Sequence, residues 1–229
     1  MFRHIVIFFI ILLILILEID RNFIITFKLY NYYIRFFPKQ IIFGIHNTIQ
    51  RFREKKFIYD VTSLKLTLFL ENSKKQLIND YIKFRNITEI YAHTTTDLLK
   101  KDFNYKYIFF KTLDKLYIDN CKKFSEINLL LKKFTNIKTC FLSIIYKQKI
   151  IPYHRGPYNG LLRYHFPLII KPNTTYLEIM GKKIYYNKPF MFDDTYPHKL
   201  VKLDNSLRVI LICDIENPYS LFHPHKLFY

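Results

Sequence analysis

The 229-residue chain has no tryptophan, only four glycines and a single alanine, at position 92. Its composition favours Ile, Lys, Asn, Tyr and Phe instead, which weakens predictions from helix propensity because Ile and Phe stand where a helix would prefer Ala or Leu. Cysteine is also scarce, since Cys121, Cys140 and Cys213 are odd in number and lack CxxC spacing. This pattern argues against a disulfide framework or a zinc site, and it favours buried thiols in a reducing compartment.

Acidic residues are half as frequent as basic ones, 18 against 36, which gives a formal net charge of +18. Such a charge is compatible with nucleic-acid binding. The basic residues are, however, spread along the chain, and no zinc-finger, homeodomain or RRM signature is present. A solvated surface or attraction to anionic lipid headgroups explains the charge equally well. A nucleic-acid partner is therefore not expected.

Hydrophobic residues make up half of the chain, and its length is enough for one domain with a small appendage. Near the start, Ile5 to Leu17 form thirteen consecutive apolar residues. This run is shorter than the roughly 20 residues that span a bilayer, but Phe2, Ile19 and a snorkelling Arg3 extend it. We expect residues 1–22 to form an uncleaved transmembrane anchor and the protein to be a single-pass membrane protein. A cleaved signal peptide, for which no small-x-small site follows, and a buried core helix remain alternatives.

Residues 23–60 follow the anchor as a juxtamembrane segment rich in aromatic and basic residues. Its first half, 23–43, has the composition of a segment that lies in the headgroup zone. Arg21, Lys28 and Arg35 outnumber Arg3 near the span, which weakly favours a cytoplasmic body.

The remaining residues, 61–229, are expected to form one domain. The spacing of apolar residues predicts a mainly helical part over 61–135. From about 138 the pattern changes to short strands and turns, which predicts an antiparallel sandwich or small barrel with a β-core over 138–218. The expected fold class is mainly β with helical support (α+β), a double-stranded β-helix of the jelly-roll or cupin type. The strands are expected at 139–146, 161–170, 176–180, 183–186, 190–192 and 206–214.

Two histidines and an arginine in the last third of the chain suggest chemistry. His154 and His198 lie on separate segments, and two imidazoles can hold a divalent metal. Arg208 sits in the apolar run 207–213, where an unpaired charge would be costly unless an anion meets it. Arg163 and His165 are two residues apart on one expected strand and so share a face. A metal beside an anion clamp suggests an iron enzyme with a dicarboxylate cosubstrate.

The motifs around these residues resemble those of the aspartyl/asparaginyl β-hydroxylase family, which are Fe(II)- and 2-oxoglutarate-dependent dioxygenases and include lipid A hydroxylases. The resemblance covers roughly residues 115–218. It rests on His154-x-Gly-Pro-x-Asn159, Leu162-Arg-Tyr-His165, Phe192-Asp-Asp-Thr-Tyr-x-His198, Arg208 ten residues later, and Asp214-x-x-x-Pro218.

The resemblance implies a role for each matching residue. His154 and His198 match the iron ligands. Arg208, His165 and Ser143 match residues that hold 2-oxoglutarate, with an ordinary strand serine as the alternative for Ser143. Arg163 and Asn159 are candidate substrate contacts.

The third iron ligand is the main departure from the wider superfamily, which has an acid two residues after the first histidine. Position 156 is glycine here. Protein-hydroxylating members of the resembled family also lack that acid, so the gap does not argue against activity. Asp193 and Asp194 are expected to form a turn.

These observations predict a membrane-anchored dioxygenase that uses Fe(II), 2-oxoglutarate and O₂ to hydroxylate an unactivated C–H and releases succinate and CO₂. The substrate is a peptidyl Asp/Asn or a lipid acyl chain, and segment 23–43 slightly favours a lipid. The alternative is a non-catalytic, membrane-anchored binding protein with the same fold. The oligomeric state and the compartment are not determined by the sequence.

Overall fold

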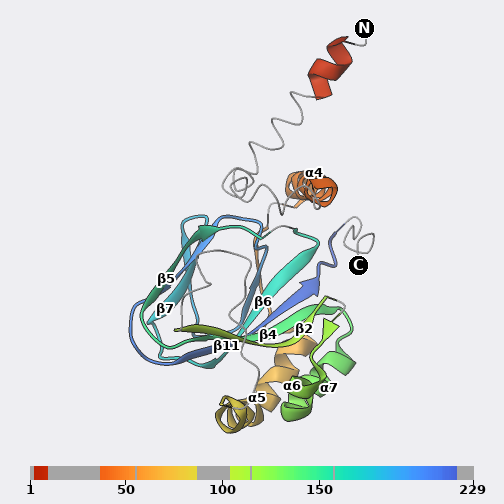
Figure 1. Cartoon of the computed structure of the whole chain (residues 1–229). Helices are drawn as coiled ribbons and strands as arrows, with labels where there is room; N and C mark the ends of the chain where they lie inside the picture. Colours follow the sequence, from red (N-terminus) through yellow and green to blue (C-terminus); the bar gives the residue numbers. More distant parts are fainter. Residues whose placement is uncertain are drawn as a thin grey trace.

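Two antiparallel sheets face each other in the computed structural model of the chain (Figure 1). The structure describes residues 3–9, 37–54, 56–86, 104–113, 115–156 and 158–220. The larger sheet has the strand order β1-β9-β6-β11-β4-β2-β3, and the smaller one has the order β5-β10-β7-β8. Every pairing in both sheets is antiparallel.

The strands of the larger sheet are β1 (Ile58–Tyr59), β2 (Tyr105–Thr112), β3 (Lys115–Leu116), β4 (Ile137–Ile145), β6 (Leu161–Ile169), β9 (Phe190–Phe192) and β11 (Arg208–Glu216). The strands of the smaller sheet are β5 (Lys149–His154), β7 (Thr175–Ile179), β8 (Lys182–Tyr185) and β10 (His198–Lys202). The described helices of the body are α4 (Phe37–Arg53), α5 (Lys65–Phe84), α6 (Ile118–Lys123) and α7 (Ser125–Lys133).

The larger sheet is buried on both faces, and its side chains alternate between two cores. On β11, Val209 and Leu211 belong to a core shared with the helices, whereas Ile210 and Ile212 belong to the core between the sheets. This alternation follows from the two-residue period of a strand. Because both faces are covered, the strand reads as a continuous apolar run, and Arg208 at its start faces the core between the sheets.

Helices α5, α6 and α7 cover the outer face of the larger sheet (Figure 1). On α5, Leu66, Leu70, Leu77 and Tyr81 are buried at spacings of four, seven and four residues, which form one helical stripe. α6 and α7 are separated at Phe124, whose buried ring contacts Phe110 of β2 with ring centroids 4.9 Å apart. The helices therefore support the sheet and leave the space between the sheets to the site.

The predicted α+β class with antiparallel sheets is confirmed, and the expected strands after residue 138 match β4, β6, β7, β8, β9 and β11. The prediction of a mainly helical 61–135 is wrong for Tyr105–Thr112, which form β2 beside β4. This run, YKYIFFKT, consists largely of aromatic and β-branched residues, which suit a strand buried on both faces. Four further strands, β1, β3, β5 and β10, were not predicted, and the domain boundaries stay predictions.

The predicted anchor, residues 1–22, lies outside the described residues except for 3–9, which are helical. Among the described parts of the chain, no helix combines the length and the apolar character that crossing a membrane requires.

Candidate active site

The two predicted iron ligands lie next to each other on paired strands. β5 ends at His154, β10 begins at His198, and these residues are Cα partners across the antiparallel pair. Their ring centroids are 4.2 Å apart. The backbone N–H of Gly156 donates to the carbonyl of Asp194 at 2.7 Å, which ties together the loops that carry the histidines. The pairing thus brings together two residues that are 44 positions apart.

Both rings are held in the same tautomer by a backbone carbonyl two residues earlier. Nδ1 of His154 lies 2.8 Å from the carbonyl oxygen of Pro152, and Nδ1 of His198 lies 2.8 Å from that of Tyr196. A carbonyl oxygen only accepts, so Nδ1 carries the proton and the Nε2 lone pair is available. Burial and the neighbouring His154 lower the pKa of His198 to about 3, which keeps its ring neutral. This is the arrangement found in histidine ligands of metals.

A carboxylate ligand from position 156 is excluded by the packing. A Cβ added to Gly156 would lie 2.1 Å from Oδ1 of Asp194, so the Asp194 carboxylate fills that space. Within the described residues there is no group of three or more His, Cys, Asp or Glu side chains suited to a metal. The geometry therefore offers two imidazole nitrogens and no third protein ligand.

The predicted anion clamp lies between the sheets, on the same face of three neighbouring strands. Nη1 of Arg208 donates to the hydroxyl of Ser143 at 3.1 Å, and its guanidinium lies 4.6 Å from the ring centroid of Tyr186. The Nε and Nη2 donors of Arg208 and the Nε2 of His165 are buried without a hydrogen-bond partner. Buried donors are normally paired, so these three atoms mark a place where an acceptor belongs.

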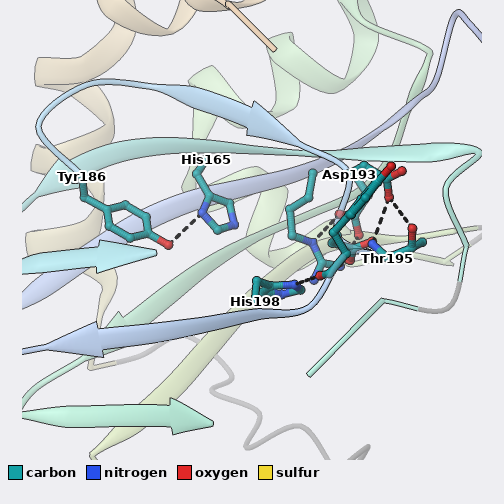
Figure 2. A network of polar contacts seen from close by, with 9 residues as sticks. His165, Tyr186, Asp193, Thr195 and His198 are labelled. Carbon is teal, nitrogen blue, oxygen red and sulfur yellow. Dashed lines mark hydrogen bonds and ion pairs between the residues drawn. The ribbon is translucent and has the colours of Figure 1, made fainter. Parts of the chain in front are cut away.

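A tyrosine that the sequence did not single out sets the proton position on His165 (Figure 2). Tyr186 Oη lies 3.0 Å from Nδ1 of His165. Burial raises the pKa of Tyr186 to about 12, so its hydroxyl keeps its proton and is able to donate it to Nδ1. Burial, with Arg208 second, lowers the pKa of His165 well below its usual value. With Tyr186 donating to Nδ1, the neutral ring carries its proton on Nε2, and this atom is then the donor that faces a bound carboxylate.

Arg163 is engaged by two carboxylates. Its Nε and Nη2 donate to Asp214 at 2.7 and 3.1 Å, and its Nη1 pairs with Asp194 at 3.0 Å. Burial raises the pKa of Asp194, against the pull of Arg163. The three side chains form one partly buried ion-pair group, in which all three guanidinium nitrogens of Arg163 contact a carboxylate.

Asp193 has the turn-forming role that its position predicts. Its Oδ1 accepts from the N–H and the hydroxyl of Thr195 at 2.9 and 2.7 Å (Figure 2). The side chain of Asn159 is bonded by the histidine and asparagine of α4, His46 and Asn47. Its predicted contact with substrate stays a prediction, since the polar contacts seen are with α4 and neighbouring loops.

The side chains present fit the groups that the resemblance implies. Two neutral imidazoles with free Nε2 atoms are suitable ligands for Fe(II). A fixed guanidinium, a hydroxyl and an N–H donor suit one carboxylate of a dicarboxylate such as 2-oxoglutarate. The orphaned donors of Arg208 and His165 are the structural sign that such an anion is expected.

Comparison with known proteins agrees with this geometry. A family model described as aspartyl/asparaginyl β-hydroxylase matches residues 71–218, which is more than half of the chain. The chain belongs to the aspartyl/asparaginyl β-hydroxylase family. All seven predicted site residues fall inside the matched range, including Ser143 near its middle.

A relative of this family member is the ornithine lipid ester-linked acyl 2-hydroxylase of Rhizobium tropici, 34% identical over 91 residues. The alignment covers 38% of this chain and 32% of the relative, so the chain spans about a third of that protein's length. Both the family model and this relative are described as hydroxylases, as the sequence predicted.

Solved structures with some likeness include an oxidoreductase of the 2OG-Fe(II) oxygenase family from Burkholderia pseudomallei (9% identity, 69% of this chain and 93% of that one, TM-score 0.43). A second is a prolyl hydroxylase from Trichoplax adhaerens in complex with a hypoxia inducible factor peptide (11% identity, 65% and 80%, TM-score 0.43). Both TM-scores are below 0.5.

Proposed function

We propose that this family member is an Fe(II)- and 2-oxoglutarate-dependent hydroxylase that acts on the acyl chain of a membrane lipid. The observation that carries the proposal is the juxtaposition of two histidines with open Nε2 atoms and three buried donors that lack an acceptor. An unpaired buried donor costs free energy, and here three of them belong to only two side chains, Arg208 and His165. A cosubstrate carboxylate would satisfy them.

The chain's own residues bind and orient. His154 and His198 would hold iron through Nε2, and the carbonyls behind them fix the direction of both rings. Arg208 and His165 donate to the distal carboxylate of 2-oxoglutarate, while Ser143 holds the guanidinium in place. Iron with 2-oxoglutarate and O₂ would supply the oxidising power to hydroxylate an unactivated C–H, with release of succinate and CO₂.

Arg208 and His165 are buried in the apolar interior between the sheets. Its core residues are mostly aromatic and aliphatic, and they include Phe190, Phe192, Ile210 and Ile212. In such surroundings the charge of Arg208 acts more strongly on a bound carboxylate than it would in water. The dry core therefore contributes to cosubstrate affinity.

The electrostatics beside the histidines favour an uncharged substrate. Arg163 pairs with Asp194 and Asp214, so the group carries one more carboxylate than cations when all three are ionised. A peptidyl aspartate would bring a further carboxylate next to Asp194 and Asp214, which already share the charge of Arg163. An acyl chain brings no charge. The lipid-modifying activity named for the Rhizobium relative supports the same choice.

Membrane attachment is part of the proposal. Residues 1–22, with their thirteen-residue apolar run, would form a single-pass anchor, and residues 23–60 would lie next to the bilayer. An anchored enzyme meets lipid substrates without leaving the membrane. The partners would then be the lipid itself and the bilayer that contains it.

A peptidyl Asp/Asn substrate is the second candidate, because the family's description names it. It and the lipid substrate are separated by ¹⁸O₂ labelling of membranes that contain the full chain, with lipid and protein fractions analysed by mass spectrometry. We expect ¹⁸O in acyl chains with the wild type and none with His198→Ala. Label confined to protein would establish the second candidate. Label in neither fraction would contradict hydroxylation of both classes.

The site itself is tested with Arg208→Met, which removes the charge and keeps much of the volume. We expect 2-oxoglutarate affinity to fall roughly 30- to 100-fold, in line with the loss of charge-assisted hydrogen bonds worth about 2–3 kcal/mol. Iron affinity should be unchanged, measured by titration with Fe(II) under argon.

Without cosubstrate the Arg208→Met variant should be at least as stable as the wild type, since an orphaned buried cation has been removed. Equal loss of iron and 2-oxoglutarate binding would contradict the assignment. A non-catalytic binding protein, the remaining alternative, would bind neither.

A further inference from the structure

Helix α4 has an apolar face that no part of the described chain covers. Phe43, His46 and Gln50 are buried against the body. On the other side, Ile45, Ile49 and Phe52 are 40%, 42% and 79% exposed. Their spacing of four and three residues places them in one row along the helix.

The helix cannot rotate to bury this row, because its inner face is fixed by polar contacts. The two ring nitrogens of His46 lie 2.9 Å from Oδ1 of Asn159 and 2.9 Å from the hydroxyl of Ser220. The side chain of Gln50 donates to the carbonyl of Tyr219 at 2.9 Å. Turning the outer row inward would leave these buried groups unpaired, at high cost. The exposed apolar row is therefore a fixed feature of the surface.

Basic side chains border the end of the row. α4 has no acidic residue in its first turn and has Arg51 and Arg53 in its last turn. Arg53 is exposed, and so is Lys56 just beyond the helix. An apolar row bordered by arginine and lysine is complementary to a bilayer with anionic headgroups, where apolar side chains enter the acyl boundary and the cations meet phosphate. The net charge of +18 strengthens the attraction.

The place of α4 in the fold connects this surface to the site. α4 lies at the end of the sandwich away from α5, α6 and α7 (Figure 1). Nη2 of Arg51 donates to the carbonyl of Thr195 at 2.9 Å, and its guanidinium lies 5.3 Å from the ring centroid of Tyr196. Thr195 and Tyr196 lie in the loop just before His198, and the carbonyl oxygen of Tyr196 accepts the hydrogen bond that orients the His198 ring. One side of the helix therefore contacts the loop of an iron ligand while the other side is apolar and exposed.

We propose that the outer face of α4, formed by Ile45, Ile49 and Phe52 with Arg53 and Lys56, docks onto the surface of an anionic lipid bilayer. Docking in this way seats the end of the sandwich that carries the histidine loops on the membrane. The surface is distinct from the apolar run at residues 5–17, which would attach the chain but would not orient the body. It involves no turnover, so hydroxylation can fail without affecting the test of docking.

The absence of tryptophan from the chain allows a single fluorescent reporter. The full chain carrying Phe52→Trp is bound to vesicles of phosphatidylcholine and phosphatidylglycerol whose acyl chains are brominated. The matched control is Ile82→Trp, a position that is 55% exposed on α5, and α5 lies at the other end of the molecule from α4 (Figure 1). We expect brominated chains to quench more than half of the emission at position 52 and little at position 82.

Three results would overturn the proposal. Equal quenching at both positions would show that α4 is no closer to the bilayer than α5. Failure of the Phe52→Trp protein to float with vesicles would exclude docking altogether. A blue shift at position 52 that rises with protein concentration in the absence of lipid would assign the face to a second copy of the chain. The role of the two cations is tested with Arg53→Glu/Lys56→Glu in the Phe52→Trp background. We expect quenching by brominated chains to fall at least twofold. Unchanged quenching would contradict the role of the two cations.

Discussion

Gly156 and Asp194 compete for the same space beside the two histidines. A side chain at position 156 would collide with the Asp194 carboxylate at 2.1 Å. We expect Gly156→Ala to lower the free energy of unfolding by about 2 kcal/mol, a usual cost of overpacking. Iron affinity should fall with it, because His154 is only two residues away. Urea unfolding and Fe(II) titration measure the two effects.

The double variant Gly156→Ala/Asp194→Ala is the control for this prediction. Removing the carboxylate makes room for the new methyl group, while Asp214 remains as a bidentate partner of Arg163. The cost of Gly156→Ala should therefore be smaller in the Asp194→Ala background than in the wild type. Equal costs in both backgrounds would show that the collision is not what the glycine avoids.

His165 makes stability depend on pH with a definite sign. Its folded-state pKa is far below the usual 6.5 because of burial and Arg208. Below pH 6.5 the unfolded chain binds a proton on this ring and the folded chain does not, so stability falls as the pH falls. The contribution of this residue is about 1.4 kcal/mol per pH unit while the folded ring stays neutral.

Comparing wild type with His165→Gln isolates this contribution from those of other groups, such as Asp194, whose raised pKa acts in the opposite direction. The free energy of unfolding is measured by urea denaturation between pH 7.5 and 5.5. The difference between the two proteins should change by about 1 kcal/mol over this range, in the direction that favours the glutamine variant at low pH. Parallel curves would contradict a buried neutral histidine.

Single residues of the site were predictable to different degrees. Arg208 stands out because an arginine in an apolar run needs a partner, whereas His154 and His198 are ordinary taken singly and stand out only through their combination and the motifs around them. Tyr186 gives no such signal, since it is one of 19 tyrosines and its role depends on the ring that lies opposite it in space. Arg163 was predicted near the substrate, but its two carboxylate partners come from other strands and loops.

At the level of elements, α4 acts on the site through the loop before His198. Arg51 holds the carbonyl of Thr195 and covers the ring of Tyr196, whose own carbonyl fixes His198. We expect Arg51→Met to weaken iron binding about three- to tenfold, consistent with the loss of an outer partner of a metal ligand. Isothermal titration with Co(II) measures the change.

Arg53→Met is the matched control, because Arg53 lies two residues later on the same helix and is exposed. Its iron affinity should equal that of the wild type. A readout beyond stability separates positioning from folding: the electronic spectrum of bound Co(II) should shift in Arg51→Met and not in Arg53→Met. Identical spectra in all three proteins would contradict a positioning role for Arg51.

The elements that sequence periodicity missed are those whose identity is settled by tertiary contacts. β2 was expected to be helical, and it becomes a strand because β4 pairs with it and helices cover its other face. β5 has an exposed, polar-interrupted sequence, KIIPYH, and its pairing with β10 is what orders it. β11 and β4, by contrast, each contain a continuous or nearly continuous apolar run, VILIC and CFLSII, so they were identified from sequence alone.

At the scale of the whole molecule, one face of the larger sheet packs against helices and the other face carries the residues of the candidate site. The helices α5, α6 and α7 bury one face of the larger sheet, so the other face can carry Arg208, His165 and Ser143 toward the smaller sheet. The smaller sheet supplies both histidines from adjacent strands. A two-residue strand period thus brings Arg208, His165 and Ser143 to one face of the larger sheet, while the pairing of β5 with β10 sets the buried His198 beside the exposed His154.

The folding unit also extends further toward the N-terminus than the family match, which begins at residue 71. Phe43 of α4 stacks on Tyr158 with ring centroids 4.7 Å apart, and His46 pairs with the fully buried Asn159. A chain of residues 55–229 loses these contacts and leaves a buried amide without its partner. We therefore expect it to be less stable than residues 36–229 by about 3 kcal/mol or more, the sum of a lost aromatic contact and a lost buried hydrogen bond.

Iron binding should change in the same comparison, because the shorter chain also lacks Arg51 and its hold on Thr195. Residues 36–229 should match the full chain in Fe(II) affinity, whereas residues 55–229 should bind several-fold more weakly even where circular dichroism shows it to be folded. If the two fragments unfold at the same urea concentration and bind iron equally, the contacts of α4 with Tyr158 and Asn159 contribute nothing to stability or to iron binding. If they differ as expected, α4 contributes to metal binding as well as carrying the surface proposed to dock on a bilayer, so docking of that surface would act on the geometry of the site.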